Sequence, residues 1–506
     1  MKVLLIIPTF HYKDSYPAPL SLSDFPTGMA YIASSLKKAG HDVYGLNPNN
    51  IRGYATGLAM IRDILRERVA DVRPDLIGLG GLCTDYAFLR DAIGIIRDID
   101  SSIPIVLGGQ IVTNDAEDIF DILKPDYAIK GEADNAIVEL VNMIRNGEIP
   151  EERIIKADVP NLDELPYPDY EPFGIQEMMD KYSMATRLLY RYSRPYPRPF
   201  SILASRSCPF SCTFCVHGHD RPPYRSRSIP DVIEEIRITY DKYKYNILIL
   251  LDELFAVNKK RMVEFCEAIV EGKEKYGWDF DWMFQTHASA KFDIETLKLA
   301  KKAGCFFFSY GLESASPTVL KSMNKRIKVE QVVKAIELAK EAKIGFGANL
   351  IFGDIAETAE TIAESLTFWF EHCKGAFVFL ADLIPYPGSQ LFDDARVMDK
   401  FRDKKEYYET IDEQVINVTK IPDTSLYELR NLYQFLDHKW LFVEAATNTY
   451  SEDEGNGFSK IWGTCPYCGE ESMYRSPNSN TEHAFWLGLG CTHCNSKIKV
   501  GVGNVC

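Results

Sequence analysis

The sequence predicts an α/β protein with two parallel-sheet domains in succession: a doubly wound domain and then a partial (β/α)6 barrel. Two observations carry this prediction. Short apolar runs alternate with helical patterns over residues 1–150 and again over residues 200–394 of the 506-residue chain, which is the order of βα units in a parallel sheet. Most of these runs are continuous rather than alternating, as in strands that are covered on both faces.

The first domain, residues 1–150, has five expected strands: Val3–Ile7, Asp42–Leu46, Leu76–Gly80, Ile105–Gly108 and Tyr127–Ile129. Between the first two, Thr27–Lys38 is expected to be an amphipathic helix. Ligands of doubly wound folds bind at the carboxyl ends of the strands. Three glycine-bearing loops follow strands there, and glycine lets the backbone approach a ligand closely, although any one of these loops could simply close a tight turn. The predicted cofactor contacts in the loops are Cys83, Thr84, Gly108, Gly109, Gln110, Gly131 and Glu132.

Residues 151–199 are rich in Pro, Tyr and Arg and are expected to form an ordered linker. The barrel, residues 200–394, has six expected strands: Phe200–Ala204, Ile247–Leu251, Phe280–Gln285, Cys305–Tyr310, Ile344–Ile351 and Ala376–Ile384. Helices are expected between them, including Pro230–Tyr243, Lys259–Lys275 and Ile294–Ala303. Functional residues of such barrels cluster on the loops at the carboxyl ends of the strands.

A cysteine motif follows the first barrel strand, in the segment CPFSCTFC. It places Cys208, Cys212 and Cys215 at the spacing C-x3-C-x2-C. Three thiolates this close can hold three irons of a [4Fe–4S] cluster and leave the fourth iron open to a substrate. The alternative is a zinc site that recruits its fourth ligand from nearby, where His217 and His219 are candidates.

The C-terminal part is expected to hold a helical segment, residues 395–455, and a zinc-ribbon-like domain, residues 456–506. Two C-x2-C pairs separated by 22 residues predict a four-thiolate Zn²⁺ site with a structural role. Its expected ligands are Cys465, Cys468, Cys491 and Cys494. Substrate capture and a second iron–sulfur cluster are the alternatives. His483 and His493 are alternative ligands, and Cys506 is expected to be a spare thiol.

The bulk properties limit the class of protein. A hydrophobic content of 46% and a charged content of 25% are ordinary for a folded soluble protein. The net charge of -15 argues against broad nucleic-acid binding. No apolar run is long enough to span a bilayer, and the apolar start is too short for a signal peptide. Seven of the twelve cysteines have metal-like spacings, which indicates metal sites in a reducing cytoplasm rather than disulfides.

The cysteine motif resembles that of the radical SAM enzymes, which also have an aromatic residue at the position of Phe214. The resemblance implies a [4Fe–4S] cluster whose open iron chelates S-adenosylmethionine (SAM), and reductive cleavage of SAM to a 5′-deoxyadenosyl radical. It also implies that strand-end residues contact SAM, namely Asp252, Glu253, Glu313, Ser314 and Asn349. The segments Lys321–Lys325 and Pro385–Ser389 fit the same family. His287 stands where relatives often have arginine, and it is either a proton donor or acceptor or a satisfied core histidine.

A doubly wound, Rossmann-like domain ahead of the barrel resembles the cobalamin-binding class of these enzymes. Supporting segments are Phe25–Gly28 and Ala39–Val43. The D-x-H-x-x-G motif that supplies a cobalt ligand elsewhere is absent, so the resemblance implies no histidine on the lower cobalt face, and Cys83 is not assigned as a ligand. A domain that has lost cobalamin is the alternative.

The resemblance implies a cobalamin-dependent radical SAM enzyme that methylates an unactivated carbon, or less readily phosphorus, of a small molecule or biosynthetic intermediate. Flavodoxin or ferredoxin is the expected reductant. A non-methylating radical cyclisation or rearrangement is the first alternative. A non-catalytic iron–sulfur or zinc docking protein is the second. An RNA-modifying role for the ribbon is a further one that the acidic chain disfavours.

Overall fold

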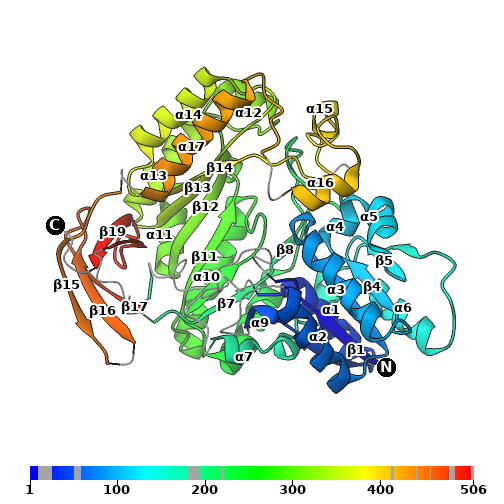
Figure 1. Ribbon diagram of the computed structural model, residues 1–506. Coiled ribbons are helices and arrows are strands. Elements are labelled where there is room, and N and C mark those ends of the chain that lie inside the picture. The colour runs from blue at the N-terminus through cyan, green and yellow to red at the C-terminus, as the bar shows by residue number, and fades with distance from the viewer. Residues whose placement is uncertain are drawn as a thin grey trace. The chain divides into compact units, whose positions relative to one another are not determined.

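The computed structural model describes residues 1–9, 25–50, 58–179, 193–194, 196–217, 221–411, 415–439, 443–455, 457–477 and 485–502 (Figure 1). His219, His483 and Cys506 lie outside these residues. The contacts within the chain divide it into two compact units. Unit 1 comprises Met1–Thr186, Phe214–Pro222 and Pro385–Ile416, and unit 2 comprises Arg187–Thr213, Pro223–Ile384 and Asn417–Cys506.

Unit 1 is built on a six-stranded parallel sheet in the order β2-β1-β3-β4-β5-β6. The strands are β1 (Lys2–Ile6), β2 (Asp42–Leu46), β3 (Leu76–Gly80), β4 (Ile105–Gly108), β5 (Tyr127–Lys130) and β6 (Ile154–Lys156). Helices α1 (Thr27–Lys38) and α6 (Ala136–Arg145) contact each other, and so do α2 (Leu58–Val72) and α3 (Tyr86–Ile99). The strand order reverses between β1 and β3, which makes the carboxyl ends of these strands the expected ligand edge.

The segment expected to be a linker packs on this sheet. β6 pairs with β5, and η4 (Glu171–Phe173) packs on β2 so closely that a Cβ on Gly45 would lie 2.4 Å from the carbonyl oxygen of Pro172. The phenol of Tyr170 is buried and donates to Thr27 Oγ1 at 3.2 Å. β6 has three residues and none is buried, so its sequence lacks the apolar run that predicted the other five strands.

Unit 2 is built on a second six-stranded parallel sheet, in the order β14-β13-β12-β11-β10-β7. This sequential order confirms the partial barrel. The strands are β7 (Pro199–Ile202), β10 (Ile247–Leu250), β11 (Asp281–Thr286), β12 (Cys305–Glu313), β13 (Gly345–Phe352) and β14 (Phe377–Asp382). The connecting helices include α9 (Ile229–Tyr243), α10 (Lys259–Tyr276), α11 (Ile294–Lys302), α13 (Val329–Glu341) and α14 (Ala359–His372).

Aromatic side chains fill the core of the barrel. Phe284 and Phe308, on neighbouring strands, stack with ring centroids 5.6 Å apart. Gly347 on β13 is required by this packing, because a Cβ there would lie 2.4 Å from the ring of Phe307.

After the barrel, helix α17 (Asp423–Lys439) contacts β14. The chain ends in an antiparallel sheet of β15 (Thr447–Asp453), β16 (Phe458–Thr464) and β17 (Glu471–Pro477) and a hairpin of β18 (Phe485–Gly490) and β19 (Lys497–Val502). A small core that includes Ile461, Tyr474, Leu489 and Val500 joins these strands. In the part of the chain that the structure describes, no helix is both long and apolar enough to cross a bilayer.

Candidate functional site

The first cysteine motif lies in the loop that follows β7 and the short strand β8 (Ser205–Arg206). Cys208, Cys212 and Cys215 are each partly exposed, and so is Phe214 between them. The turn after helix α12 (Pro317–Ser322) holds the first half of this loop. Asn324 donates its amide to the carbonyl of Ser211 at 2.8 Å, and the backbone N–H of Thr213 donates to the carbonyl of Met323 at 3.1 Å. The Lys321–Lys325 segment therefore lies against the cysteine loop.

A buried ion pair stands beside this turn, at the carboxyl end of β12. Lys325 Nζ lies 2.9 Å from Glu313 Oε1, and the two side chains are 8% and 11% exposed. Burial acts to lower the pKa of Lys325, but the Glu313 carboxylate and the thiolates of Cys212 and Cys208 outweigh it, so the pKa of Lys325 is raised. The lysine thus keeps its positive charge where two cysteine thiolates need compensation.

The backbone is arranged to admit this pair. Glu313 has a φ of 66°, in the left-handed region that non-glycine residues rarely adopt. A Cβ on Gly311 would lie 2.5 Å from the Glu313 carboxylate and 2.6 Å from Lys325 Nζ. The glycine in the Tyr310–Ser314 element is therefore a steric requirement of the ion pair.

His287, at the end of β11, lies under the same loop. Its ring stacks on Phe210 with centroids 3.8 Å apart and an interplanar angle of 23°, and its Nε2 lies 3.3 Å from the carbonyl oxygen of Lys325. The side chain is buried, and burial followed by the Lys325 charge lowers the pKa of His287 to about 4. The imidazole is therefore neutral near pH 7, and its contacts are those of a packed residue that supports the loop.

Besides Glu313, two of the residues implied as SAM contacts form hydrogen bonds within the protein. Asp252, after β10, is 2% exposed. It accepts hydrogen bonds from the Ser205 hydroxyl and, at 3.1 Å, from the Ala204 backbone N–H. Burial raises the pKa of Asp252 to about 6 against these hydrogen bonds. Ser314 is also buried, and its hydroxyl lies 3.1 Å from that of Ser365. Asp252 thus fixes the turn that leads into the cysteine loop.

The two remaining implied SAM contacts are more accessible. Asn349 is exposed on β13, and Glu253 is partly exposed.

The turn after β13 holds a buried carboxyl group whose environment the sequence does not reveal. Glu357 accepts from Thr361 Oγ1 at 2.7 Å and from the Gly353 N–H at 3.3 Å. Burial raises the pKa of Glu357 to about 7, because it outweighs these two hydrogen bonds. Asp354 is buried beside it and adds to the shift. The sequence signal, an acid at a helix start, is too common to reveal this burial.

The structure brings the predicted loops of unit 1 together at the carboxyl edge of β3, β4 and β5. Gly109, between β4 and α4 (Gln110–Asn114), has a φ of 82°, and a Cβ on it would lie 2.6 Å from the Gly81 nitrogen. The N–H of Gly131 donates to Thr113 Oγ1 at 3.1 Å, which ties the β5 loop to α4. Cys83, Gln110 and Glu132 are partly exposed along this edge, as are Thr84 and Gly108. The glycine at position 109 therefore allows the β3 and β4 loops to pack closely against each other at this edge.

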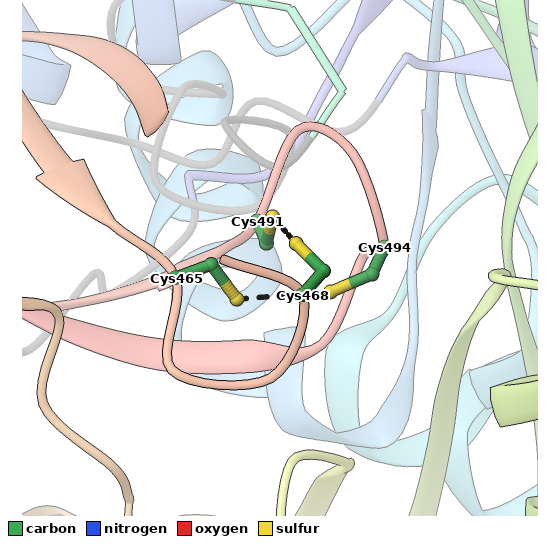
Figure 2. A group of neighbouring side chains, drawn as sticks. All are labelled: Cys465, Cys468, Cys491 and Cys494. Carbon is green, nitrogen blue, oxygen red and sulfur yellow. Dashed lines mark hydrogen bonds between the residues drawn. The ribbon is translucent and has the colours of Figure 1, made fainter. Parts of the chain in front are cut away.

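Figure 2 shows the four cysteines of the C-terminal pairs meeting between two turns. One ligand atom from each of Cys465, Cys468, Cys491 and Cys494 lies within 4.8 Å of the others. The two turns have the same backbone hydrogen bond. The N–H of Gly469 donates to the carbonyl oxygen of Cys465, and the N–H of Asn495 donates to the carbonyl oxygen of Cys491, both at 2.9 Å. Within the described residues, the thiols of Cys208, Cys212 and Cys215 do not form a group of this kind, so their role as cluster ligands rests on their spacing.

His493 is not one of the ligands, because its Nε2 lies 2.9 Å from the carbonyl oxygen of Glu471. The four-cysteine site contacts the amino ends of the barrel strands. The N–H of Lys497 donates to the Gly375 carbonyl before β14 at 2.8 Å, and the amide of Asn495 donates to the Lys343 carbonyl before β13 at 3.1 Å. It therefore lies at the end of these strands that is opposite the Glu313 and Glu357 turns.

Two family models match the chain in tandem. The B12 binding domain matches residues 24–141, and the Radical SAM superfamily matches residues 202–368. An uncharacterized methyltransferase of Pyrococcus horikoshii is 26% identical over 410 residues, which are 78% of this chain and 83% of the relative. An anaerobic magnesium-protoporphyrin IX monomethyl ester cyclase of Rubrivivax gelatinosus is 27% identical over 379 residues, 72% of this chain and 65% of the cyclase.

A solved structure has the same fold. The radical S-adenosylmethionine methyltransferase TsrM of Kitasatospora setae superposes with a TM-score of 0.59 at 17% identity, over 77% of this chain and 74% of TsrM. Its fold, the two matched models and the cysteine motif after the first barrel strand agree. The chain belongs to the radical SAM superfamily and carries a B12-binding domain ahead of its radical SAM domain.

Proposed function

We propose that this protein is a cobalamin-dependent radical SAM methyltransferase that acts on an unactivated carbon of a small molecule or biosynthetic intermediate. One observation carries the proposal: a single chain joins a B12-binding domain to a radical SAM barrel whose first strand leads into C-x3-C-x2-C. Relatives named as methyltransferases support it, among them the Pyrococcus protein and the hopanoid C-3 methylase of Methylococcus capsulatus, which is 26% identical over 365 residues.

The residues present fit the two cofactors that the proposal requires. Cys208, Cys212 and Cys215 would hold three irons through their thiolates, and Lys325 places a buried positive charge that favours thiolates at Cys208 and Cys212. At the edge formed by their loops, Gly109 is exposed and Gly81 is partly exposed, so a corrinoid ring could lie on this backbone. When bound, the cluster with SAM would supply a radical that removes hydrogen from carbon, and cobalamin would supply a methyl group.

The protein's own contribution is to fix the cysteine loop. Asp252 holds the turn at Ser205 before the loop, and Asn324 holds the carbonyl of Ser211 within it. The ring of Phe210 stacks on the ring of His287. Asp252 follows β10, His287 follows β11 and Asn324 follows helix α12, so three separate elements hold the loop. A cluster that exchanges electrons benefits from such rigid support.

For the four-cysteine site we propose Zn²⁺ in a structural role. Four thiols, two buried and two partly buried, give the closed tetrahedral set typical of structural zinc. The site lies by Gly375 and Lys343, at the amino ends of barrel strands, whereas barrel active sites lie at the carboxyl ends. This position supports a structural role over substrate capture. A second iron–sulfur cluster has the same ligands, and metal analysis distinguishes the two.

The chemistry also requires a one-electron donor. We propose flavodoxin or ferredoxin for this role and a reducing cytoplasm as the location, because seven of the twelve cysteines have metal-like spacings.

A second candidate function is a radical cyclisation without methyl transfer. The relatives named as anaerobic magnesium-protoporphyrin IX monomethyl ester cyclases favour it. The match to this chain covers 65% of the length of the Rubrivivax gelatinosus cyclase and 64% of that of the Cereibacter sphaeroides cyclase. The two functions differ in what becomes of SAM. Methylation consumes one SAM for the radical and one as methyl donor, whereas cyclisation needs only the first.

The test uses the full chain, purified without oxygen and reconstituted with iron, sulfide and hydroxocobalamin. It is incubated with a reductant, SAM labelled in its methyl group and a small-molecule extract of the source cells. Methylation predicts both 5′-deoxyadenosine and S-adenosylhomocysteine, with label in an extract component. 5′-Deoxyadenosine without S-adenosylhomocysteine would favour the cyclisation. If no SAM is cleaved by protein with a full complement of iron, both enzyme functions are wrong and a docking protein remains.

A further inference from the structure

The segment after the last barrel strand belongs to unit 1 rather than to the barrel. Residues 385–411 include helices α15 (Ala395–Met398) and α16 (Lys404–Thr410) and share a compact unit with Met1–Thr186. The segment has its own small core, since the ring of Tyr407 packs against Phe392 and Phe401 and its hydroxyl donates to the Pro385 carbonyl at 2.6 Å. It is therefore an ordered part of unit 1.

Residues of helix α16 contact the first residue of α3 and the residue that precedes α5 in that unit. Tyr408 stacks on Tyr86, the first residue of α3, with ring centroids 5.3 Å apart and an angle of 22°, and both side chains are buried. The Tyr408 hydroxyl donates to Asp115 Oδ2 at 2.9 Å, and Lys404 Nζ lies 2.7 Å from Asp115 Oδ1. Asp115 immediately precedes helix α5 (Ala116–Leu123).

Two further residues of the segment, Glu409 and Gly388, contact the same edge. Glu409 accepts from the Tyr86 hydroxyl at 3.1 Å and forms an ion pair with Arg90. At the other end of the segment, Gly388 has a φ of 88°, and a Cβ on it would lie 2.6 Å from the side chain of Asn114, the last residue of α4. Any larger residue at position 388 would push the turn away from α4.

These contacts converge on the loops that form the proposed ligand edge. Tyr86 follows directly after the Gly80–Asp85 loop of β3, and α4 with Asp115 follows the Gly108–Gly109 loop of β4. Cys83 is close enough to Tyr408 to act on it electrostatically. Burial raises the pKa of Tyr408 above its usual range, and the charges of Asp115 and Cys83 add to the shift. The phenol therefore stays protonated and can donate to Asp115.

We propose that residues 385–411 are a clasp that orders the β3 and β4 loops of the B12-binding domain and thereby sets its affinity for the corrinoid. This inference rests on the proposed function, because it takes a corrinoid as the ligand of that edge. Tyr408 is a positioning residue at its centre. Free of the clasp, the starts of α3 and α5 would lose their buried aromatic and ionic partners, and the loops before them would fluctuate more.

The test compares the full-length wild-type protein with Tyr408→Ala and Tyr408→Phe. Tyr427→Ala is the matched control, because Tyr427 is a 57% exposed tyrosine on α17 of unit 2. Two quantities are measured: the Kd for hydroxocobalamin by absorbance titration, and the hydrogen exchange of residues 82–90 and 109–118 without ligand, by mass spectrometry. The exchange of β1 and β3 and the iron content report whether each variant is folded.

Tyr408→Ala is expected to raise the Kd and the exchange rate of both segments by about tenfold or more, with β1, β3 and the iron content unchanged. Tyr408→Phe keeps the stacking on Tyr86 and should give a smaller increase, and Tyr427→Ala should give none. Unchanged exchange and affinity in a folded Tyr408→Ala protein would overturn the clasp and leave the proposed function standing. A wild-type protein that binds no cobalamin would overturn the proposed function, and with it the corrinoid as the clasp's ligand.

Discussion

Lys325 and Glu313 form an ion pair, 2.9 Å long and almost fully buried, at the carboxyl end of β12. Removing either partner of such a pair destabilises the fold, because the remaining charge would be buried without an opposite charge beside it. The positive φ of Glu313 and the absence of a side chain at Gly311 both serve to bring the two groups together. The carbonyl of Lys325 also contacts His287, so the pair and the support of the cysteine loop are parts of one structure.

Lys325→Met should therefore lower both the stability of unit 2 and the iron content. Removing one partner of a buried pair costs about 3–5 kcal/mol, and the thiolates of Cys208 and Cys212 would lose a buried positive charge that interacts with them. Iron per chain after reconstitution and the initial rate of 5′-deoxyadenosine formation are measured. Lys321→Met, at an exposed lysine on the neighbouring helix α12, is the control and should behave as wild type. Equal iron content and rate in Lys325→Met and wild type would contradict this role.

His287→Ala should reduce iron retention and SAM cleavage at least tenfold, because the stacking on Phe210 is lost. His287→Phe keeps an aromatic ring there and should retain most of both. Since the pKa of His287 is about 4, no inflection in the rate between pH 6 and 8 is expected from this residue. His372→Ala, on the surface of α14, is the control. If the Phe variant were as inactive as the Ala variant, a proton-transfer role would replace the packing role.

The sequence predicted what short-range patterns determine. Continuous apolar runs such as Leu76–Gly80 identify buried parallel strands. The two C-x2-C pairs are recognisable as a metal-binding pattern from their spacing alone, and the structure brings Cys465 and Cys494 together with their Sγ atoms 3.7 Å apart. Side-chain contacts between residues far apart in the sequence could not be predicted from it. The sequence around Asp252 does not indicate that its carboxylate accepts a hydrogen bond from Ser205. The hydrogen bond from Tyr408 to Asp115 joins residues that are 293 positions apart in the sequence.

Glu357 should make the stability of unit 2 depend on pH. Its pKa is about 7 in the folded protein and about 4.5 when unfolded, so the folded state binds more protons between these values. The free energy of unfolding therefore falls as the pH rises from about 4.5 to about 7, by roughly 3 kcal/mol for a shift of this size. Glu357→Gln removes this contribution and should show a smaller fall in melting temperature between pH 5 and 7.5 than wild type.

Glu360→Gln is the control for this measurement, because Glu360 is exposed at the start of the same helix, α14. It should leave the pH dependence of wild type in place. A Glu357→Gln protein with the same pH dependence as wild type would show that the carboxyl group is already ionised at pH 5.

Cys468→Ser should separate the two metal sites. The structure places Cys468 with Cys465, Cys491 and Cys494, near the amino ends of β13 and β14, and away from the turns that hold the cysteine loop. The variant is expected to lose about one zinc per chain and to melt at a lower temperature, because a structural metal contributes its binding energy to folding. It should keep its iron and its SAM cleavage at temperatures below the new transition. Cys208→Ser is the reciprocal control and should lose iron and SAM cleavage while keeping the zinc. Iron rather than zinc at the four cysteines, or loss of SAM cleavage in folded Cys468→Ser protein, would show that the C-terminal site takes part in the chemistry.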